Sequence, residues 1–150
     1  HKDIPVYPIE IVGIYWYATE KLKEPARERL KKKLSVHNKE ADSCPFLIEN
    51  SCSIHPLRPI ACRQFNVLGS SCSEGEDPYY TRRPEVLTPI QEYTDEAFFI
   101  TLPFYGVNDD KEKEKVIKGN LIHTQAIILK TCNWQKLKKI MDDFDSKKSA

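Results

Sequence analysis

The chain has 150 residues and a net charge of +1, with 40% hydrophobic and 30% charged residues. This length suits one domain with a real core, and this composition is that of a soluble globular protein. No run approaches the roughly 18 apolar residues that a membrane span needs, and the N-terminus lacks the pattern of a signal peptide. The nearly balanced charge gives no global reason to expect nucleic acid as a partner. We therefore predict a cytoplasmic, single-domain protein that does not contact a membrane.

Residues 1–40 form the first of three parts, and they predict two helices. Pro8 fits a helix start, and the apolar residues that follow have helical spacing: Ile11, Ile14, Tyr15, Ala18 and Leu22. Pro25 suits the first turn of a second helix that runs to about His37. We interpret the lysine run at 31–33 as a solvated helix face, with a contact to nucleic acid or phosphate as the alternative.

Residues 41–90 form the second part, which is rich in Pro, Ser, Asn and Gly and has almost no hydrophobic period. Such a segment is expected to bury little apolar surface, and so long an irregular loop is uncommon inside a compact domain. We predict that a metal orders it, because metal-binding free energy can serve as folding free energy. The Tyr-Tyr-Thr-Arg-Arg motif at 79–83 is interpreted as a loop packed on the core. The alternative is a surface that stacks on bases or binds an anionic ligand.

Residues 91–145 form the third part. Ala97 to Leu102 predicts either a short strand or a buried turn of helix, the charged stretch 109–117 predicts a helix, and the apolar stretch 120–130 predicts a buried helix. Asn133 is a candidate N-cap for an amphipathic helix with a core stripe of Trp134, Leu137, Ile140, Met141 and Phe144. The predicted fold class is mainly α: a small helix bundle with a long cysteine-bearing irregular loop, and room for one short strand pair.

Four of the five cysteines lie in the second part, spaced C-x7-C-x9-C-x9-C: Cys44, Cys52, Cys62 and Cys72. Thiolates are soft ligands that suit zinc, Cu(I) and iron–sulfur clusters. Arg58 and Arg63 are placed in the sequence to offset the negative charge of such a site. The spacing differs from the paired CxxC of a zinc ribbon and from that of a bacterial ferredoxin. Metal ligation, a disulfide within the segment and unliganded thiols all stay open on spacing alone.

The remaining candidates for chemistry are three single residues. His55 lies between two candidate ligands and would add a nitrogen donor, but we interpret it as a partly exposed loop histidine. Cys132 is interpreted as a buried structural thiol, and His123 as a core histidine rather than a ligand. The sequence contains no GxGxxG, Walker A, HExxH or GxSxG motif. It therefore predicts no catalytic residue, and it leaves open whether the protein is an enzyme.

The residues around the cysteines carry a family resemblance. Cys44-Pro-Phe-Leu and the following Cys52-Ser-Ile-His-Pro-Leu-Arg58-Pro59-Ile-Ala-Cys62-Arg63 resemble the downstream half of the YkgJ-like, or CxxCxxCC, family of zinc- or iron-chelating proteins. The resemblance covers residues 44–72. A weaker similarity lies in Ile4-Pro-Val-Tyr-Pro-Ile-Glu-Ile, which looks like the segment after the family's first cysteine group. The resemblance implies a metal-binding protein with a structural or metal-handling role, in which Zn²⁺ or an iron–sulfur cluster is held by Cys44, Cys52, Cys62 and Cys72.

This chain departs from the family pattern at one point. The upstream C-x2-C-x2-C-C group, which would precede residue 1, is not in the sequence. Either the group has been lost here, in which case we expect an incomplete site, or the chain is a divergent member with half of the ligand set. A related motif occurs in flagellin lysine-N-methylases, so the resemblance also admits a cluster-dependent enzyme of methyl transfer or redox chemistry. A disulfide-stabilised or thiol-redox interaction protein is the third alternative.

Overall fold

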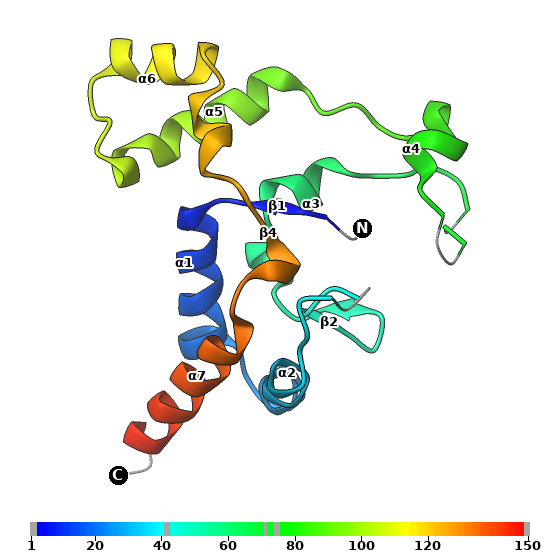
Figure 1. Cartoon of the computed structure of the whole chain (residues 1–150), viewed down its shortest axis with the longest axis vertical. Helices are drawn as coiled ribbons and strands as arrows, with labels where there is room; N and C mark the ends of the chain where they lie inside the picture. Colours follow the sequence, from blue (N-terminus) through cyan, green and yellow to red (C-terminus); the bar gives the residue numbers. More distant parts are fainter. Residues whose placement is uncertain (1–2, 41–42, 71, 74–75, 149–150) are drawn as a thin grey trace. The chain divides into compact units, whose positions relative to one another are not determined.

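The computed structural model of the chain describes residues 3–40, 43–70, 72–73 and 76–148. They divide into two compact units: unit 1 is His1–Arg58 with Ile127–Ala150, and unit 2 is Pro59–Ala126. The described elements are mainly helical, with two short antiparallel strand pairs (Figure 1). The mainly α fold class is therefore confirmed, with one strand pair more than the sequence predicts. No helix in the described ranges is long and apolar enough to cross a membrane.

The helices of unit 1 begin and end near the predicted residues. They are α1 (Pro8–Trp16), which continues into a π-helical turn at Tyr17–Lys21, then α2 (Ala26–Ser35) and α7 (Trp134–Lys148). Pro8 occupies the first turn of α1, where its missing N–H costs nothing. Asn133 caps α7, since its Oδ1 accepts the backbone N–H of Lys136 at 3.3 Å. Helix α2 packs against α7 (Figure 1).

The core of unit 1 combines residues from both ends of the chain. Trp134 lies at its centre: its ring meets the Phe46 ring edge-on at a centroid distance of 4.7 Å, and its Nε1 donates to the Leu129 carbonyl at 2.7 Å. The buried cluster comprises Val6, Ile14, Ala18, Leu22, Leu30, Leu34, Phe46, Ile54, Leu129, Trp134, Leu137 and Met141. The apolar stripes predicted for α1 and α7 supply much of it.

A buried arginine joins α2 to α7. The side chain of Arg27 is only 8% exposed, and it forms an ion pair with Asp145 at 2.7 Å. Its Nη1 also donates to the carbonyls of Ala18 and Thr19 at 2.6 and 2.8 Å, near the end of the π-helical turn. Because helix ends leave carbonyls without intrahelical partners, Arg27 satisfies groups that would otherwise be buried unpaired.

Both strand pairs belong to unit 1. Strand β1 (Pro5–Val6) pairs with β4 (Ile127–Ile128), so the first residues of the chain meet a segment near its end. Strand β2 (Leu47–Ile48) pairs with β3 (Ser51–Cys52). The two residues between β2 and β3, Glu49 and Asn50, both have positive φ, 47° and 61°. This is the conformation that a two-residue type I′ hairpin turn requires.

Unit 2 has a smaller set of buried side chains. Its helices are α3 (Ile60–Gln64), α4 (Pro78–Thr81), α5 (Gln91–Thr101) and α6 (Asp110–Lys118). Asp109 caps α6, since its Oδ1 accepts the N–H groups of Lys111 and Glu112 at 3.0 and 3.1 Å. Among the residues that the structure describes in this unit, the buried hydrophobic side chains other than proline are Val86, Phe98, Leu102 and Ile122.

Two predictions about the third part of the sequence are resolved. The segment from Ala97 to Leu102 is helical, because most of it lies in α5. The prediction of a buried helix at 120–130 is wrong: the chain forms a 3₁₀ turn at Leu121–Gln125, then β4, then another 3₁₀ turn at Leu129–Thr131. Asn120 takes a left-handed conformation with φ 53°, and the β-branched pair Ile127–Ile128 favours the extended backbone that pairs with β1.

The cysteine-bearing segment also differs from the prediction. Phe46 and Ile54 are fully buried in the core of unit 1, so this part of the loop does bury apolar surface. The expectation that the segment buries little apolar surface is therefore wrong for the hairpin, and the ordering of the segment by a metal stays a prediction. The lysine run is not simply a solvated face either. Lys31 pairs with Glu28, Asp142 and Asp145, and the Nζ of Lys33 donates to the Leu47 carbonyl.

Candidate functional site

Two of the four candidate metal ligands lie on the hairpin of unit 1. Cys44 precedes β2, and its carbonyl accepts the N–H of Leu47 at 3.2 Å, while Cys52 ends β3 directly opposite Leu47. Both side chains are half-buried and pack against the hydrophobic core of unit 1. The same apolar anchors, Phe46 and Ile54, therefore position both thiols.

The other two candidate ligands lie in unit 2. Cys62 is a half-buried residue of the short helix α3. Cys72 is exposed, and the Nη2 of Arg82 lies 3.8 Å from its sulfur, at a distance where the guanidinium can donate to it. The sequence suggested Arg58 and Arg63 as the cations beside the cysteines, and it missed Arg82, which lies ten residues after Cys72. Sequence adjacency gave no signal for this contact.

Arg82 is the centre of a polar network that holds this segment. Its Nε pairs with Glu76 at 2.8 Å, and its Nη1 pairs with Glu85 and approaches the Ser70 carbonyl at 3.3 Å. Hydrogen bonds from Arg82, from the backbone of Ser73 and from the Thr81 hydroxyl lower the pKa of the Glu76 carboxyl to about 2. The first arginine of the 79–83 motif is therefore already paired with carboxylates of this chain.

The chemistry of the four cysteines suits a metal, but their arrangement in the part of the chain that the structure describes does not form a metal site. Thiolates at Cys44, Cys52, Cys62 and Cys72 fit a soft ion such as Zn²⁺ or an iron–sulfur cluster. Among the described residues, however, no three His, Cys, Asp or Glu side chains are grouped closely enough to hold a metal ion. The structure thus presents two cysteines in each unit, and each pair has to be judged by itself.

The sequence also singled out His55, His123 and Cys132. The structure confirms the prediction for the first and corrects the predictions for the other two. His55 is an exposed residue at the start of a 3₁₀ turn, as predicted. His123 is not a core histidine: it is exposed in the turn at Leu121–Gln125, where its ring meets Phe98 edge-on. Cys132 is half-buried rather than fully buried, but it packs on the core of unit 1, and burial raises the pKa of its thiol. Burial and the neighbouring Cys132 also raise the pKa of Tyr15.

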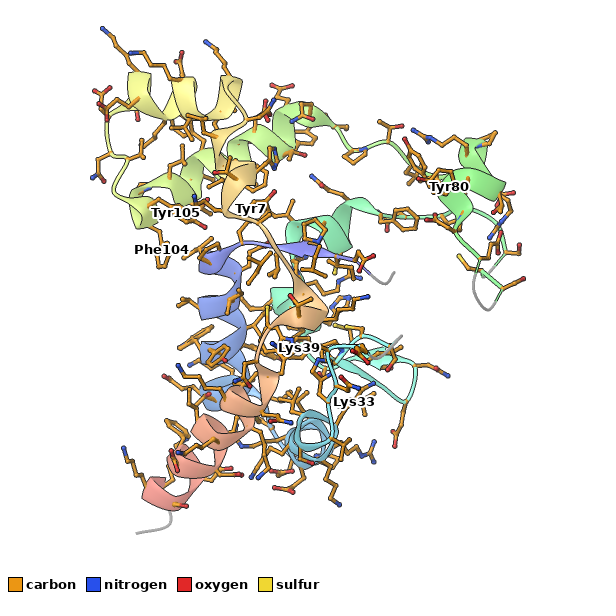
Figure 2. All side chains as sticks on the ribbon, in the orientation of Figure 1. Tyr7, Lys33, Lys39, Tyr80, Phe104 and Tyr105 are labelled. Atoms are coloured by element: carbon orange, nitrogen blue, oxygen red, sulfur yellow. The ribbon has the colours of Figure 1, made fainter. Side chains whose placement is uncertain are left out.

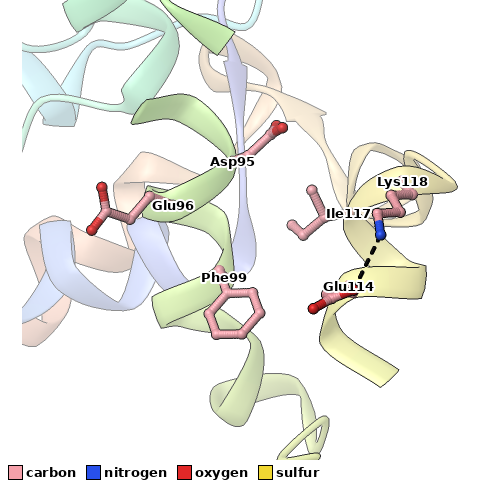
Figure 3. Close-up of a pocket in the computed structure, with 6 residues that line it drawn as sticks. All are labelled: Asp95, Glu96, Phe99, Glu114, Ile117 and Lys118. Carbon is pink, nitrogen blue, oxygen red and sulfur yellow. Dashed lines mark hydrogen bonds and ion pairs between the residues drawn. The ribbon is translucent and has the colours of Figure 1, made fainter. Parts of the chain in front are cut away.

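A shallow hollow of about 230 Å³ lies between α5 and α6. Phe99 from α5 and Ile117 from α6 extend into it, and the ion pair of Lys118 with Glu114 lies at its edge (Figure 3). Lys113 places its ammonium 4.8 Å from the centre of the Phe99 ring. The lysines of α6 therefore already engage both a carboxylate and the aromatic face of this hollow.

Two further hollows adjoin α3 in unit 2, with volumes of about 400 and 230 Å³. They share four lining residues, Gln64, Leu87, Thr88 and Pro89, so they are neighbours, and we call them together the α3 groove. The larger hollow also includes Arg63, Ile90 and Tyr93, and the smaller one includes Phe65, Tyr79 and Arg83. No sequence pattern predicts the groove, because α3, the segment 87–90 and α5 are separate stretches of the chain.

Comparisons with family models, curated proteins and solved structures found no match for this chain.

Proposed function

We propose that the protein binds a soft metal, Zn²⁺ or an iron–sulfur cluster, through thiolates drawn from Cys44, Cys52, Cys62 and Cys72. The observation that carries the proposal is the placement of Cys44 and Cys52 on one hairpin, where the same buried anchors hold both thiols against the core. Thiolate donors select such metals by their softness. The resemblance of residues 44–72 to the YkgJ-like family supports the same ligand set.

The exposure of the candidates also supports this role. None of the four cysteines is fully buried, which suits ligands that take up a metal from solvent. The Arg82 guanidinium beside Cys72 places positive charge near a sulfur that would be anionic when it binds metal. We propose the cytoplasm as the location, because reducing compartments keep cysteines as thiols. The role is structural or metal-handling.

Metal content after anaerobic purification tests the proposal directly. We expect near-stoichiometric zinc in a colourless protein, or iron with visible absorption in a brown one. The double variant Cys44→Ser/Cys52→Ser is expected to lose most of this metal. Cys132→Ser is the matched control, because that cysteine lies outside the window and packs on the same core.

A second double variant, Cys62→Ser/Cys72→Ser, shows whether the cysteines of unit 2 contribute. If each double variant by itself empties the protein of metal, both pairs supply ligands, and if one of them keeps the metal, its pair does not. If the purified protein carries no metal and takes up none of the added Zn²⁺ or iron and sulfide, the proposal is wrong. Counting thiols under non-reducing conditions then decides whether the cysteines are joined in disulfides instead.

A further inference from the structure

The α3 groove has the exposed apolar lining of an interaction surface. Tyr93 is 65% exposed and Ile90 is 61% exposed, and Leu87 and Tyr79 are also exposed. A contiguous exposed patch of apolar side chains with a polar rim is typical of a binding surface. The volume of the larger hollow, about 400 Å³, lies within the usual range of ligand sites.

The charge of the groove is of one sign. Each hollow contains one arginine, Arg63 in the larger and Arg83 in the smaller, and no carboxylate is among the described side chains that line either one. The first turn of α5 borders the larger hollow through Tyr93, and the N-terminal end of a helix carries partial positive charge. Glu92 lies in the same turn but does not line the groove. The groove therefore favours an anionic occupant.

The two hollows repeat one combination of side chains. Each is lined by one tyrosine and one arginine: Tyr93 and Arg63 in the larger, Tyr79 and Arg83 in the smaller. In the smaller hollow, the Arg83 guanidinium lies 4.8 Å from the centre of the Tyr79 ring, and its Nη1 donates to the Val86 carbonyl at 3.1 Å. This arrangement fixes the guanidinium in place, and a guanidinium has further N–H groups to offer a carboxylate.

From these features we propose that the α3 groove binds an extended, acidic peptide segment of a partner protein. Two neighbouring hollows that share lining residues suit successive apolar side chains of one extended chain. The arginine in each hollow suits a carboxylate next to each apolar side chain. Aromatic side chains and arginine are also the residues that contribute most binding energy at protein interfaces.

A single-stranded nucleic acid fits these features less well. Its affinity depends on many phosphate contacts and on open aromatic faces for the bases. The groove has two arginines, and Arg83 already covers a face of the Tyr79 ring. Much of the lining is aliphatic, with Ile60, Leu87 and Ile90 in the larger hollow, which suits leucine-like side chains better than bases.

The test uses a fluorescein-labelled peptide of repeated Glu-Leu-Pro units and fluorescence anisotropy. In a polyproline II helix, with three residues per turn, this peptide presents leucines along one edge and glutamates along another. The same peptide with lysine in place of glutamate tests the charge, and labelled oligothymidine tests nucleic acid. We expect binding of the glutamate peptide that weakens as salt is raised.

Two variants and two matched controls locate the binding. Tyr93→Ala is expected to weaken binding about 10-fold, the effect of losing one well-placed interface side chain, and Arg63→Glu is expected to weaken it at least as much. Tyr80→Ala and Lys111→Glu are the controls, because both residues are exposed in unit 2 and line neither hollow. Tyr80 lies on α4 (Figure 2) and is 82% exposed. Circular dichroism confirms that all four variants are folded.

The proposal is overturned if the glutamate peptide does not bind, or if neither Tyr93→Ala nor Arg63→Glu weakens its binding. It is also overturned if oligothymidine binds more tightly than the peptide and depends on the same two residues. The metal content of Tyr93→Ala should equal that of the unchanged protein. The peptide result and the metal result are therefore separate tests.

Discussion

The two units differ in where they place their large apolar side chains. Unit 1 gathers them in a buried cluster around Trp134 and Phe46. Unit 2 leaves many of them exposed: Leu68, Tyr79, Tyr80, Leu87, Ile90, Tyr93, Ile100, Phe104 and Leu121. Burial of apolar surface is the main favourable term in folding, whereas exposed apolar surface is available for contacts with other molecules. We infer that unit 1 supplies most of the stability of the chain and that unit 2 supplies most of its surface for recognition.

The largest expected difference in stability is between two Phe→Ala substitutions, one in each unit. Phe46→Ala removes a fully buried ring that packs on Trp134, and it should cost about 3–5 kcal/mol in the free energy of unfolding. Phe104→Ala changes a ring that is 50% exposed in the turn after α5 (Figure 2), and it should cost less than about 1 kcal/mol. Urea denaturation followed by circular dichroism measures both. Equal losses would contradict the contrast between the units.

A smaller loss of stability is expected when the two arginines that pair with carboxylates, Arg27 and Arg82, are replaced in turn. Arg27→Ala should cost about 3 kcal/mol, because it removes a buried ion pair with Asp145 and strands the carbonyls of Ala18 and Thr19. Arg82→Ala should have a smaller effect on the melting temperature, since its network holds an outer loop.

Arg27→Lys refines this test. A lysine keeps the charge but lacks the planar fork that reaches Asp145 and both carbonyls, so it should restore only part of the lost stability. If Arg27→Ala leaves the melting temperature unchanged, or lowers it less than Arg82→Ala does, then Arg27 does not have the structural role that its contacts suggest.

The smallest expected effect is the response of the two carboxylates to acid. The pKa of Glu76 is lowered from an ordinary value of 4.5 to about 2, chiefly by Arg82, and the pKa of Asp145 is lowered chiefly by Arg27. A carboxyl whose pKa is lower in the folded protein stabilises it above the unfolded pKa, and this contribution is lost as the pH falls through the folded pKa. The Glu76 contribution should therefore be present above about pH 4.5 and disappear as the pH approaches 2.

Carbon-detected NMR of the side-chain carboxyls during an acid titration measures both groups. In the unchanged protein Glu76 should remain ionised well below pH 4.5, and in Arg82→Ala its pKa should rise toward 4.5, while the hydrogen bonds from Ser73 and Thr81 still lower it. Asp145 should respond to Arg27→Ala in the same direction while Glu76 does not. A titration of Glu76 near 4.5 in the unchanged protein would refute the Arg82 network.

Local signals in the sequence predicted the helices but not the packing between distant segments. Pro8 marks α1, Asp109 and Asn133 cap α6 and α7, and each signal lies within a few residues of the structure that it specifies. The hairpin from β2 to β3 was missed because its turn is Glu49–Asn50, which lacks the glycine that usually marks a type I′ turn. The strand β4 was missed because its pairing with β1 depends on residues at the other end of the chain.

The same limit applies to the candidate site. The spacing of the cysteines drew attention to Cys44, Cys52, Cys62 and Cys72, but it did not show that they fall in two units. Phe46 and Ile54 are apolar residues without a period, and they are buried by distant parts of the chain, as the Phe46 ring is by Trp134 of α7. The Arg82 contact to Cys72 and the α3 groove depend on how the chain folds back in unit 2, which no local pattern specifies.

The pairing of β1 with β4 has a consequence for the order of events during synthesis. Unit 2 is a continuous stretch whose residues are all joined before Ile127 is added, whereas unit 1 needs both ends of the chain. Until α7 is synthesised, Leu30 and Leu34 of α2 lack Trp134, Leu137 and Met141 as partners. Domains generally fold as units, and an incomplete core exposes apolar surface that promotes aggregation. The N-terminal part of unit 1 therefore has an incomplete core until the C-terminal helix is made, and its apolar side chains lack their partners during that interval.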